Sequence, residues 1–277
     1  MKLSSVFATE KLDNLRAIIK DLGPTLVAFS GGVDSSFLLA VAVEVLREKV
    51  VALMTISSST PQEDAEQAVS LARALGVQLF TIPHDELAIP EYAANPTNRC
   101  YFCKNSLYEI CRREANRLSL PSIVDGVNSD DLGDYRPGLR AAIEYGVFHP
   151  LVEAHFTKAE IRRASKLLGL PTWEKPASPC LSSRVPYGTQ ITATMLAQIA
   201  QGESSLRSLG FQALRVRHHG MSARLEINGE DFPKLMSPSV IETIKGRMQK
   251  AGFVSILLDM EGYRSGVFNE GLHKSGR

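Results

Sequence analysis

Along the first 170 residues, segments with the hydrophobic pattern of a strand alternate with segments that have the pattern of a helix. Short apolar runs with strand character occur at residues 25–30 (TLVAFS), 50–57 (VVALMTIS), 77–83 (VQLFTIP) and 122–128 (SIVDGVN). Helical spacing separates them, and an N-terminal stretch places Leu12, Leu15, Ile18 and Ile19 on one face of an expected amphipathic helix. Strands that alternate with helices predict an α/β fold with a doubly wound parallel sheet. Ligands bind beyond the carboxyl ends of the strands in such sheets.

Two segments carry the signature of a helix start. Thr60 and Glu63 form a predicted capping box, with Pro61 at the first helical position, and Thr157 and Glu160 form a second one. Both boxes precede amphipathic stretches, which supports the helix-and-strand alternation.

The composition changes after a proline-rich stretch at residues 170–188 (LPTWEKPASPCLSSRVPYG). A helix ending at Gly210 is expected next, followed by a hairpin of two strands (ALRVRHH and SARLEIN) and a last strand (VSILLDM). We therefore predict two domains, a nucleotide-binding domain at residues 1–186 and a smaller α+β domain at residues 187–277.

Charge and apolar content exclude some classes of function. The chain has 277 residues and a formal net charge of +1, so no overall basic field favours nucleic acid or an anionic membrane. No apolar run approaches the roughly 20 residues of a membrane span, and the N-terminus has no signal-peptide pattern. We expect a cytoplasmic protein in a reducing compartment, where a C-x-x-C pair points to metal binding or catalysis.

The strongest motif is AFSGGVDSSFLLA, in which an expected strand ends at Ser30 and a helix begins near Val33. The N–H groups of Ser30 to Ser36 are expected to converge on an anion at the helix N-terminus, and Asp34 suits Mg²⁺. A tight strand–helix turn without a ligand is the competing explanation. The stretch resembles the S-G-G-x-D-S loop of the PP-loop ATP pyrophosphatases rather than a Walker A loop. That resemblance implies cleavage of ATP to AMP and pyrophosphate, with adenylylation of a carboxylate and displacement of AMP by a nucleophile.

Three cysteines form a candidate ligand set. Cys100 and Cys103 make a C-x-x-C pair, and Cys180 lies in the proline-rich stretch. Three thiolates can hold a [4Fe-4S] cluster and leave one iron open to a hydrosulfide. Unrelated thiols are one alternative, and a zinc site is another. Zinc would need a fourth ligand, for which the candidates are His84, His149 and His155. Cys111 is expected to be a core thiol.

The motifs together resemble one PP-loop branch, the LarE family. The matching stretches are FSGGVDS, NRCYFCK, DGVNSDDLGDYRPGLRA, PASPCLSSRVPYG, LRSLGF, RVRHH and ARLEI, in that order. The resemblance implies an ATP-dependent sulfur transferase of nickel-pincer nucleotide cofactor biosynthesis. Its substrate is pyridinium-3,5-dicarboxylate mononucleotide, whose carboxylates are adenylylated and converted to thiocarboxylates. Some members consume a cysteine sulfur, whereas this chain resembles the three-cysteine, iron–sulfur type. Sulfide or a sulfur donor and a homo-oligomer are further expectations.

The resemblance also implies a set of site residues. The expected residues for ATP and Mg²⁺ are Ser30, Gly31, Gly32, Asp34, Ser35, Ser36, Gly126, Asp131 and Arg136, with Asp130 and Asp134 nearby. The expected catalytic set is Cys180, Cys100, Cys103, Asp34 and Arg184. Arg184 either stabilises charge on the acyl-adenylate or caps a turn.

The substrate is expected on the last domain. Arg215 and Arg217 share one face of a strand, as do Arg224 and Glu226 on the next, and guanidiniums suit phosphate and carboxylate groups. A solvated charged strand face is the alternative. Glu203 and Asp231 resemble family positions near the sulfur-bearing cysteine, although a lone Glu on a helix is commonly solvated.

Three other functions compete with this hypothesis. A PP-loop tRNA thiolase can carry three cluster cysteines, but the chain has no Lys/Arg-rich tract for a polyanion. An amide synthetase of this length would use free ammonia. A non-enzymatic ATP-binding protein with structural zinc is the third.

Overall fold

The computed structural model describes residues 3–133 and 136–264, with side chains from residue 10 onward. These residues group into two compact units. Unit 1 comprises residues 1–57, 62–84 and 98–175, and unit 2 comprises residues 58–61, 85–97 and 176–277, taken over their described parts. The division into domains at residues 1–186 and 187–277 stays a prediction.

Unit 1 is built on a parallel four-stranded sheet in the order β3-β2-β1-β4. Its strands are β1 (Thr25–Ala28), β2 (Val50–Ile56), β3 (Gln78–Pro83) and β4 (Ser122–Asp125). A parallel bridge from Val124 to Phe148 extends the sheet beyond β4. The predicted strands at residues 25–30 and 122–128 are shorter in the structure, because pairing stops at Ala28 and Asp125, where the site loops begin.

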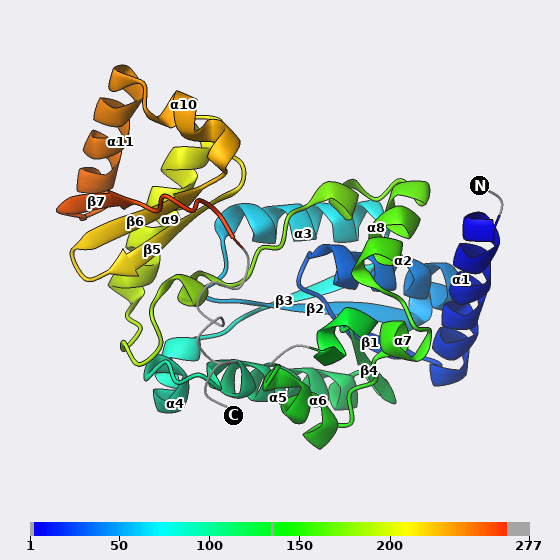
Figure 1. The fold of residues 1–277 in the computed structure, drawn as a ribbon. Helices are drawn as coiled ribbons and strands as arrows, with labels where there is room; N and C mark the ends of the chain where they lie inside the picture. Colours follow the sequence, from blue (N-terminus) through cyan, green and yellow to red (C-terminus); the bar gives the residue numbers. More distant parts are fainter. Residues whose placement is uncertain (1–2, 134–135, 265–277) are drawn as a thin grey trace, which may run out of the picture. The chain divides into compact units, whose positions relative to one another are not determined.

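Helices cover both faces of this sheet (Figure 1). Val27 packs in one apolar cluster with α1 (Leu3–Leu22), α2 (Val33–Leu46), α3 (Gln62–Ala74) and α8 (Lys158–Leu167). Its neighbours Leu26 and Ala28 pack in another cluster with α5 (Arg99–Arg117) and α6 (Gly138–Glu144). Successive strand residues point to opposite faces, so both faces of the sheet are buried. The predicted doubly wound α/β fold is confirmed.

Local sequence signals place several of these helices. Thr157 and Glu160 form the predicted capping box at the start of α8. The helix α3 begins at Gln62, one residue after the predicted Pro61. In α1, Leu15 and Ile19 are buried in the core, and Leu12 and Ile18 pack against it, as predicted. Cys111 is fully buried, which confirms it as a core thiol, and burial raises the pKa of this thiol to about 12.

Unit 2 contains a three-stranded sheet in the order β5-β6-β7. Strand β5 (Leu214–His219) pairs antiparallel with β6 (Ser222–Ile227), which confirms the predicted hairpin, and β6 pairs parallel with β7 (Ser255–Leu258). The helix α9 (Ala193–Arg207) starts at the N-cap Thr192, and its Leu206 packs with Val216 in the core of the unit. The smaller α+β part of the fold is therefore confirmed.

Short elements complete the structure. The remaining helices are α4 (Pro90–Ala93), α7 (Pro150–Glu153), α10 (Phe232–Leu235) and α11 (Pro238–Lys250). Single 3₁₀ turns are η1 (Arg47–Lys49), η2 (Glu86–Ala88), η3 (Ser129–Gly133), η4 (Pro171–Glu174), η5 (Leu181–Arg184) and η6 (Gly229–Asp231). No helix in the described part of the chain is long and apolar enough to cross a membrane.

Candidate active site

The loop between β1 and α2 is folded by its own serine hydroxyls. Ser35 Oγ lies 3.0 Å from Ser30 Oγ and donates to the Gly32 carbonyl at 3.3 Å. Gly31 has φ of +70°, and a Cβ there would lie 2.5 Å from the Ala68 Cβ of α3, so glycine is required for both conformation and space. The loop is thus pre-formed at the start of a helix.

Fewer N–H groups remain available to an anion than the sequence predicted. The Ser36 N–H donates to the Gly32 carbonyl in the helix ladder. The Ser30 N–H donates to Ser35 Oγ at 3.3 Å, and the Gly32 N–H to Ser30 Oγ at 3.4 Å. The hydroxyls therefore occupy part of the donor set that was expected to bind an anion directly.

Asp34, at the first turn of α2, carries the most unusual group of the loop. Its Oδ2 is paired with the Lys158 ammonium, whereas its Oδ1 is buried and has no hydrogen-bond partner among the described residues. Burial raises the pKa of Asp34, the nearby Asp131 raises it further, and Lys158 opposes both. A buried carboxylate oxygen without a donor is a fitting ligand for a divalent cation.

Two lysines bring positive charge to the loop. Lys158 is the first residue of α8, and Lys175 Nζ lies 2.9 Å from Asp64 Oδ1 and 3.3 Å from the Gly31 carbonyl. Arg162 Nη2 donates to the backbone carbonyl of Lys175 at 2.7 Å. The sequence analysis missed both lysines. The signal for Lys158 was present in the Thr157 capping box, which places Lys158 in the first turn of a helix.

The loop after β4 packs directly against the β1–α2 loop. A Cβ on Gly126 would lie 2.7 Å from the Ser35 nitrogen, so only glycine allows this contact. Asp131 pairs with Arg136 at 2.6 Å and accepts the Asn128 N–H at 3.0 Å. The predicted ATP-site residues of both loops are thus brought together in unit 1, except Asp134, which lies outside the described residues.

The cysteines belong to different units. Cys100 is exposed and Cys103 half-buried, both in the first turn of α5, where a spacing of three places them on one helix face. Cys180 is half-buried at the N-cap of η5 in unit 2. None of these cysteines forms a disulfide, and within residues 3–133 and 136–264 no group of three or more His, Cys, Asp or Glu side chains is arranged to hold a metal ion.

Arg184 and Glu203 form a buried ion pair in unit 2, both with fully buried side chains. Arg184 Nε and Nη2 donate to the two oxygens of Glu203 at 2.8 and 3.1 Å. Burial alone would raise the pKa of Glu203, but the Arg184 charge and hydrogen bonds lower it. The expectation that a lone Glu on a helix is solvated is wrong here, because its partner is supplied from another segment.

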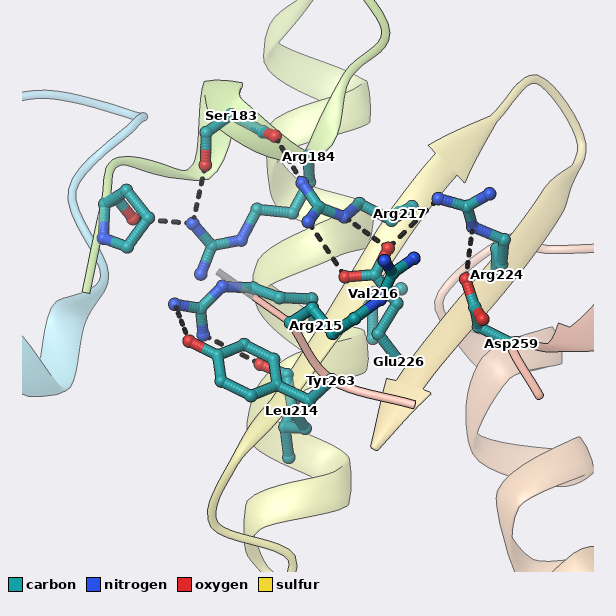
Figure 2. Close-up of polar contacts among 12 residues, drawn as sticks. Ser183, Arg184, Leu214, Arg215, Val216, Arg217, Arg224, Glu226, Asp259 and Tyr263 are labelled. Atoms are coloured by element: carbon teal, nitrogen blue, oxygen red, sulfur yellow. Dashed lines mark hydrogen bonds and ion pairs between the residues drawn. The ribbon is translucent and has the colours of Figure 1, made fainter. Parts of the chain in front are cut away.

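The β5–β6 hairpin gathers three more arginines (Figure 2). Arg217 donates to both oxygens of Glu226 at 2.9 and 2.8 Å, and Arg224 contacts the same carboxylate at 3.0 Å. The register places Arg215 opposite Glu226 and Arg217 opposite Arg224, so all four side chains share one face, as predicted. This face is not the solvated charged face considered as an alternative, since Arg215, Arg217 and Glu226 are buried.

Arg215 differs from its neighbours in its partners. It donates to the carbonyls of Leu214 and Ala177 at 2.8 and 2.7 Å and to the Tyr263 hydroxyl at 3.2 Å. No carboxylate of the described residues lies at salt-bridge distance from it. Burial, together with the charge of Arg184, lowers the pKa of Arg215 to about 10. A buried cation with only neutral acceptors is a candidate site for an anionic ligand.

Comparisons with known proteins agree with this geometry. The NAD synthase family model matches residues 10–97, which include the β1–α2 loop. An uncharacterized protein of Synechocystis is 43% identical over 95% of this chain and 98% of its own. The pyridinium-3,5-bisthiocarboxylic acid mononucleotide synthase of Lactiplantibacillus plantarum is 36% identical over 98% of both chains. The NH₃-dependent NAD⁺ synthetase of Methanopyrus kandleri is 54% identical over 19% of each chain.

Proposed function

The chain belongs to the LarE family of ATP-using enzymes, and we propose that it transfers sulfur to pyridinium-3,5-dicarboxylate mononucleotide, converting its carboxylates to thiocarboxylates. The observation that carries the proposal is the similarity to the L. plantarum synthase over 98% of both chains. The β1–α2 loop with its partnerless Asp34 oxygen supplies independent support, because it fits the Mg²⁺–ATP that such a reaction consumes.

The first half of the reaction uses unit 1. A substrate carboxylate oxygen attacks the α-phosphorus of ATP, the α–β bond breaks, and pyrophosphate leaves with its electron pair. The leaving group gains negative charge, so the start of α2 and the ammonium groups of Lys158 and Lys175 are suited to stabilise it. Lys158 is paired with Asp34 in the structure, and we propose that it turns to the phosphates when a cation takes Asp34.

Mg²⁺ fits this site by the chemistry of its donors. Asp34 Oδ1 would hold it, with Asp131 as a further carboxylate whose charge acts on Asp34. The ion would neutralise phosphate oxygens and make pyrophosphate a better leaving group.

The second half is nucleophilic displacement by sulfur. Hydrosulfide attacks the acyl carbon, the bond from that carbon to the AMP oxygen breaks, and AMP leaves. The S–H proton passes to the solvent as the thiocarboxylate forms. We propose that Cys100, Cys103 and Cys180 act together in this step as ligands of a [4Fe-4S] cluster. None of the three is used in a disulfide, and three thiolates would hold such a cluster, which would supply an iron with an open position for hydrosulfide.

The anionic groups of the substrate are assigned to the buried face of the β5–β6 hairpin. Arg215 is the preferred residue, because its hydrogen bonds go to neutral oxygens, while Arg217 and Arg224 already share Glu226. A phosphate or carboxylate at Arg215 would supply the counter-charge that the protein does not. A homo-oligomeric state stays a prediction.

The proposal is tested with anaerobically purified protein, ATP, Mg²⁺ and the dicarboxylate nucleotide, with sulfide, ammonia or tRNA compared as further reactants. We expect a thiocarboxylate, and repeated turnover to AMP and pyrophosphate, only with sulfide. ADP and phosphate as products, or turnover with ammonia or tRNA alone, would overturn it. The cluster assignment predicts about four irons per chain and several sulfurs transferred per chain. It fails if product stops at one sulfur per chain and Cys180 loses the mass of H₂S.

A further inference from the structure

The segment that carries Cys180 is held through its backbone carbonyls by arginine side chains. Residues 175–180 have no regular secondary structure, and the two prolines at 176 and 179 provide no N–H donors for it. Arg184 Nη1 donates to the carbonyls of Pro179 at 2.6 Å and Cys180 at 3.0 Å. Flanking carbonyls are bound in the same way, that of Ala177 by Arg215 at 2.7 Å and that of Ser183 by Arg217 at 2.8 Å. Figure 2 shows the guanidiniums of Arg184 and Arg217 beside Ser183 and that of Arg215 beside Tyr263.

The Arg184 guanidinium is itself fixed by the core of unit 2. Glu203, on α9, accepts two hydrogen bonds from Arg184 and a third from the Val216 N–H of β5 at 3.2 Å. Arg207 supplies a fourth from the outer side at 2.9 Å. The carbonyl of Cys180 is therefore connected through Arg184 and Glu203 to the helix and strand that form the core of the unit.

A second set of contacts holds the residues just after Cys180. The Leu181 N–H donates to the Ser59 carbonyl at 2.8 Å, and Ser182 Oγ lies 2.6 Å from the Tyr92 hydroxyl. Ser182 and Tyr92 are fully buried. The backbone is thus held on both sides of Cys180.

Stability alone does not account for a buried ion pair. Removing two charges from water is costly, and well-packed apolar residues of similar volume often stabilise a protein as much or more. Arg184 also has no exposed surface with which to touch a ligand, and its nitrogens donate to Glu203, Ser183 and the two carbonyls. What the pair provides is a fixed position for the Cys180 backbone.

We propose that Arg184 and Glu203 are positioning residues that hold Cys180 in the geometry needed for sulfur transfer. The effect on sulfur transfer rests on the proposed function. The restraint on the Cys180 backbone does not depend on that function. Of the two roles predicted for Arg184, it favours the turn over direct contact with the acyl-adenylate.

The test compares Arg184→Lys, Glu203→Gln and the double variant Arg184→Met/Glu203→Leu with Arg207→Ala. The first three variants remove the Arg184 guanidinium, the Glu203 carboxylate that fixes it, or both. Arg207→Ala removes one hydrogen bond to the same carboxylate without touching the Cys180 segment. The double variant avoids leaving one buried charge unpaired, so it keeps the test informative if the single variants unfold.

Two measurements on reduced, metal-free protein report on the restraint. The rate of alkylation at Cys180, read by peptide mass spectrometry, should rise about tenfold or more, as expected for loss of a charge-assisted hydrogen bond. Amide exchange at residues 180–184 should accelerate by a similar factor. Cys100 serves as the internal reference and should change by less than about twofold, as should Cys180 in Arg207→Ala.

The half-reactions provide the functional readout. Substrate-dependent pyrophosphate release should stay near wild type in the positioning variants, while thiocarboxylate formation falls about tenfold or more. Unchanged Cys180 alkylation in all three variants, or an equal loss of both half-reactions, would overturn the positioning role. A wild-type protein that forms no thiocarboxylate would instead refute the proposed function, and the alkylation and exchange data would still decide whether the restraint exists.

Discussion

Substitution of Gly126 by alanine tests whether the two site loops depend on direct contact. The added Cβ would lie 2.7 Å from the Ser35 nitrogen, 2.9 Å from the Ser35 Cα and 3.1 Å from the Asp34 carbonyl carbon. Carbon atoms pack best at about 3.5–4.0 Å, so the backbones must separate by roughly 0.6 Å or more. No flexible side chain can yield, because all three obstructing atoms belong to the backbone of the first turn of α2.

The expected cost follows from this overlap. Overpacking of this kind destabilises proteins by about 1–3 kcal/mol, and each kcal/mol lowers the melting temperature of a chain of this size by about 2–4 °C. The displaced Asp34 and Ser35 would no longer meet the phosphates, and a misplacement near 1 Å can cost roughly a hundredfold in rate. Pyrophosphate release from ATP at saturating Mg²⁺ should therefore fall by about ten- to a hundredfold.

A matched control lies in the loop after β4, which also contains Gly126. No atom of the described residues lies within 4 Å of a Cβ added at Gly133, so Gly133→Ala should leave the melting temperature unchanged and pyrophosphate release within about twofold of wild type. A Gly126→Ala protein that melts and releases pyrophosphate like the wild type would show that the two loops do not pack as described.

Three further substitutions give distinct outcomes. Asp34→Ala should abolish AMP and pyrophosphate release with little change in melting temperature, and retained Mg²⁺-dependent turnover would contradict its role. Arg215→Ala should weaken nucleotide-substrate binding by about 1.5–3 kcal/mol, as measured by calorimetry, and equal affinity in Arg215→Ala and wild type would contradict the anion site. The pKa of Glu203 lies below its ordinary value of 4.5, so the stability from its ion pair is complete above that value and lost as pH falls through the folded pKa. Wild type should therefore lose stability between about pH 5 and pH 3, measured by urea unfolding, and Glu203→Gln should lose less; identical slopes would contradict the ion pair.

Features that depend on neighbours in sequence could be predicted. Strand periodicity, the Thr157 capping box and the glycines of the β1–α2 loop are local, and the structure confirms the first two. Gly31 needs its positive φ, which the sequence pattern anticipated as an unusual loop conformation. The same local information could not reveal that Ser30 and Gly32 use their N–H groups within the loop, because that depends on how the serine hydroxyls turn.

Contacts between distant residues were the ones that the sequence analysis missed. Lys158 lies 124 residues after Asp34, and Lys175 lies 111 residues after Asp64, so no local pattern connects them. Glu203 was expected at the substrate site, with a solvated side chain as the alternative, but Val216 of β5 and Arg184 of η5 both donate to its buried carboxylate. The choice of partner is a tertiary property, although the period-two pattern did identify the shared face of Arg215 and Arg217.

The balance of charge around the β5–β6 hairpin explains why this face suits an anion better than a solvated surface would. Five guanidiniums meet three carboxylates there, a difference of two positive charges, counted over Arg184, Arg207, Arg215, Arg217, Arg224, Glu203, Glu226 and Asp259. Backbone carbonyls and hydroxyls accept further N–H groups of Arg184, Arg215 and Arg217 but provide no counter-charge, and burial reduces the screening by water. The pKa of Arg215 is lowered because burial and the charge of Arg184 both disfavour its charged form. We propose that a substrate with a phosphate and two carboxylates would relieve this excess of positive charge, so that Arg215, which also holds the Ala177 carbonyl of the Cys180 segment, would draw the substrate toward that segment.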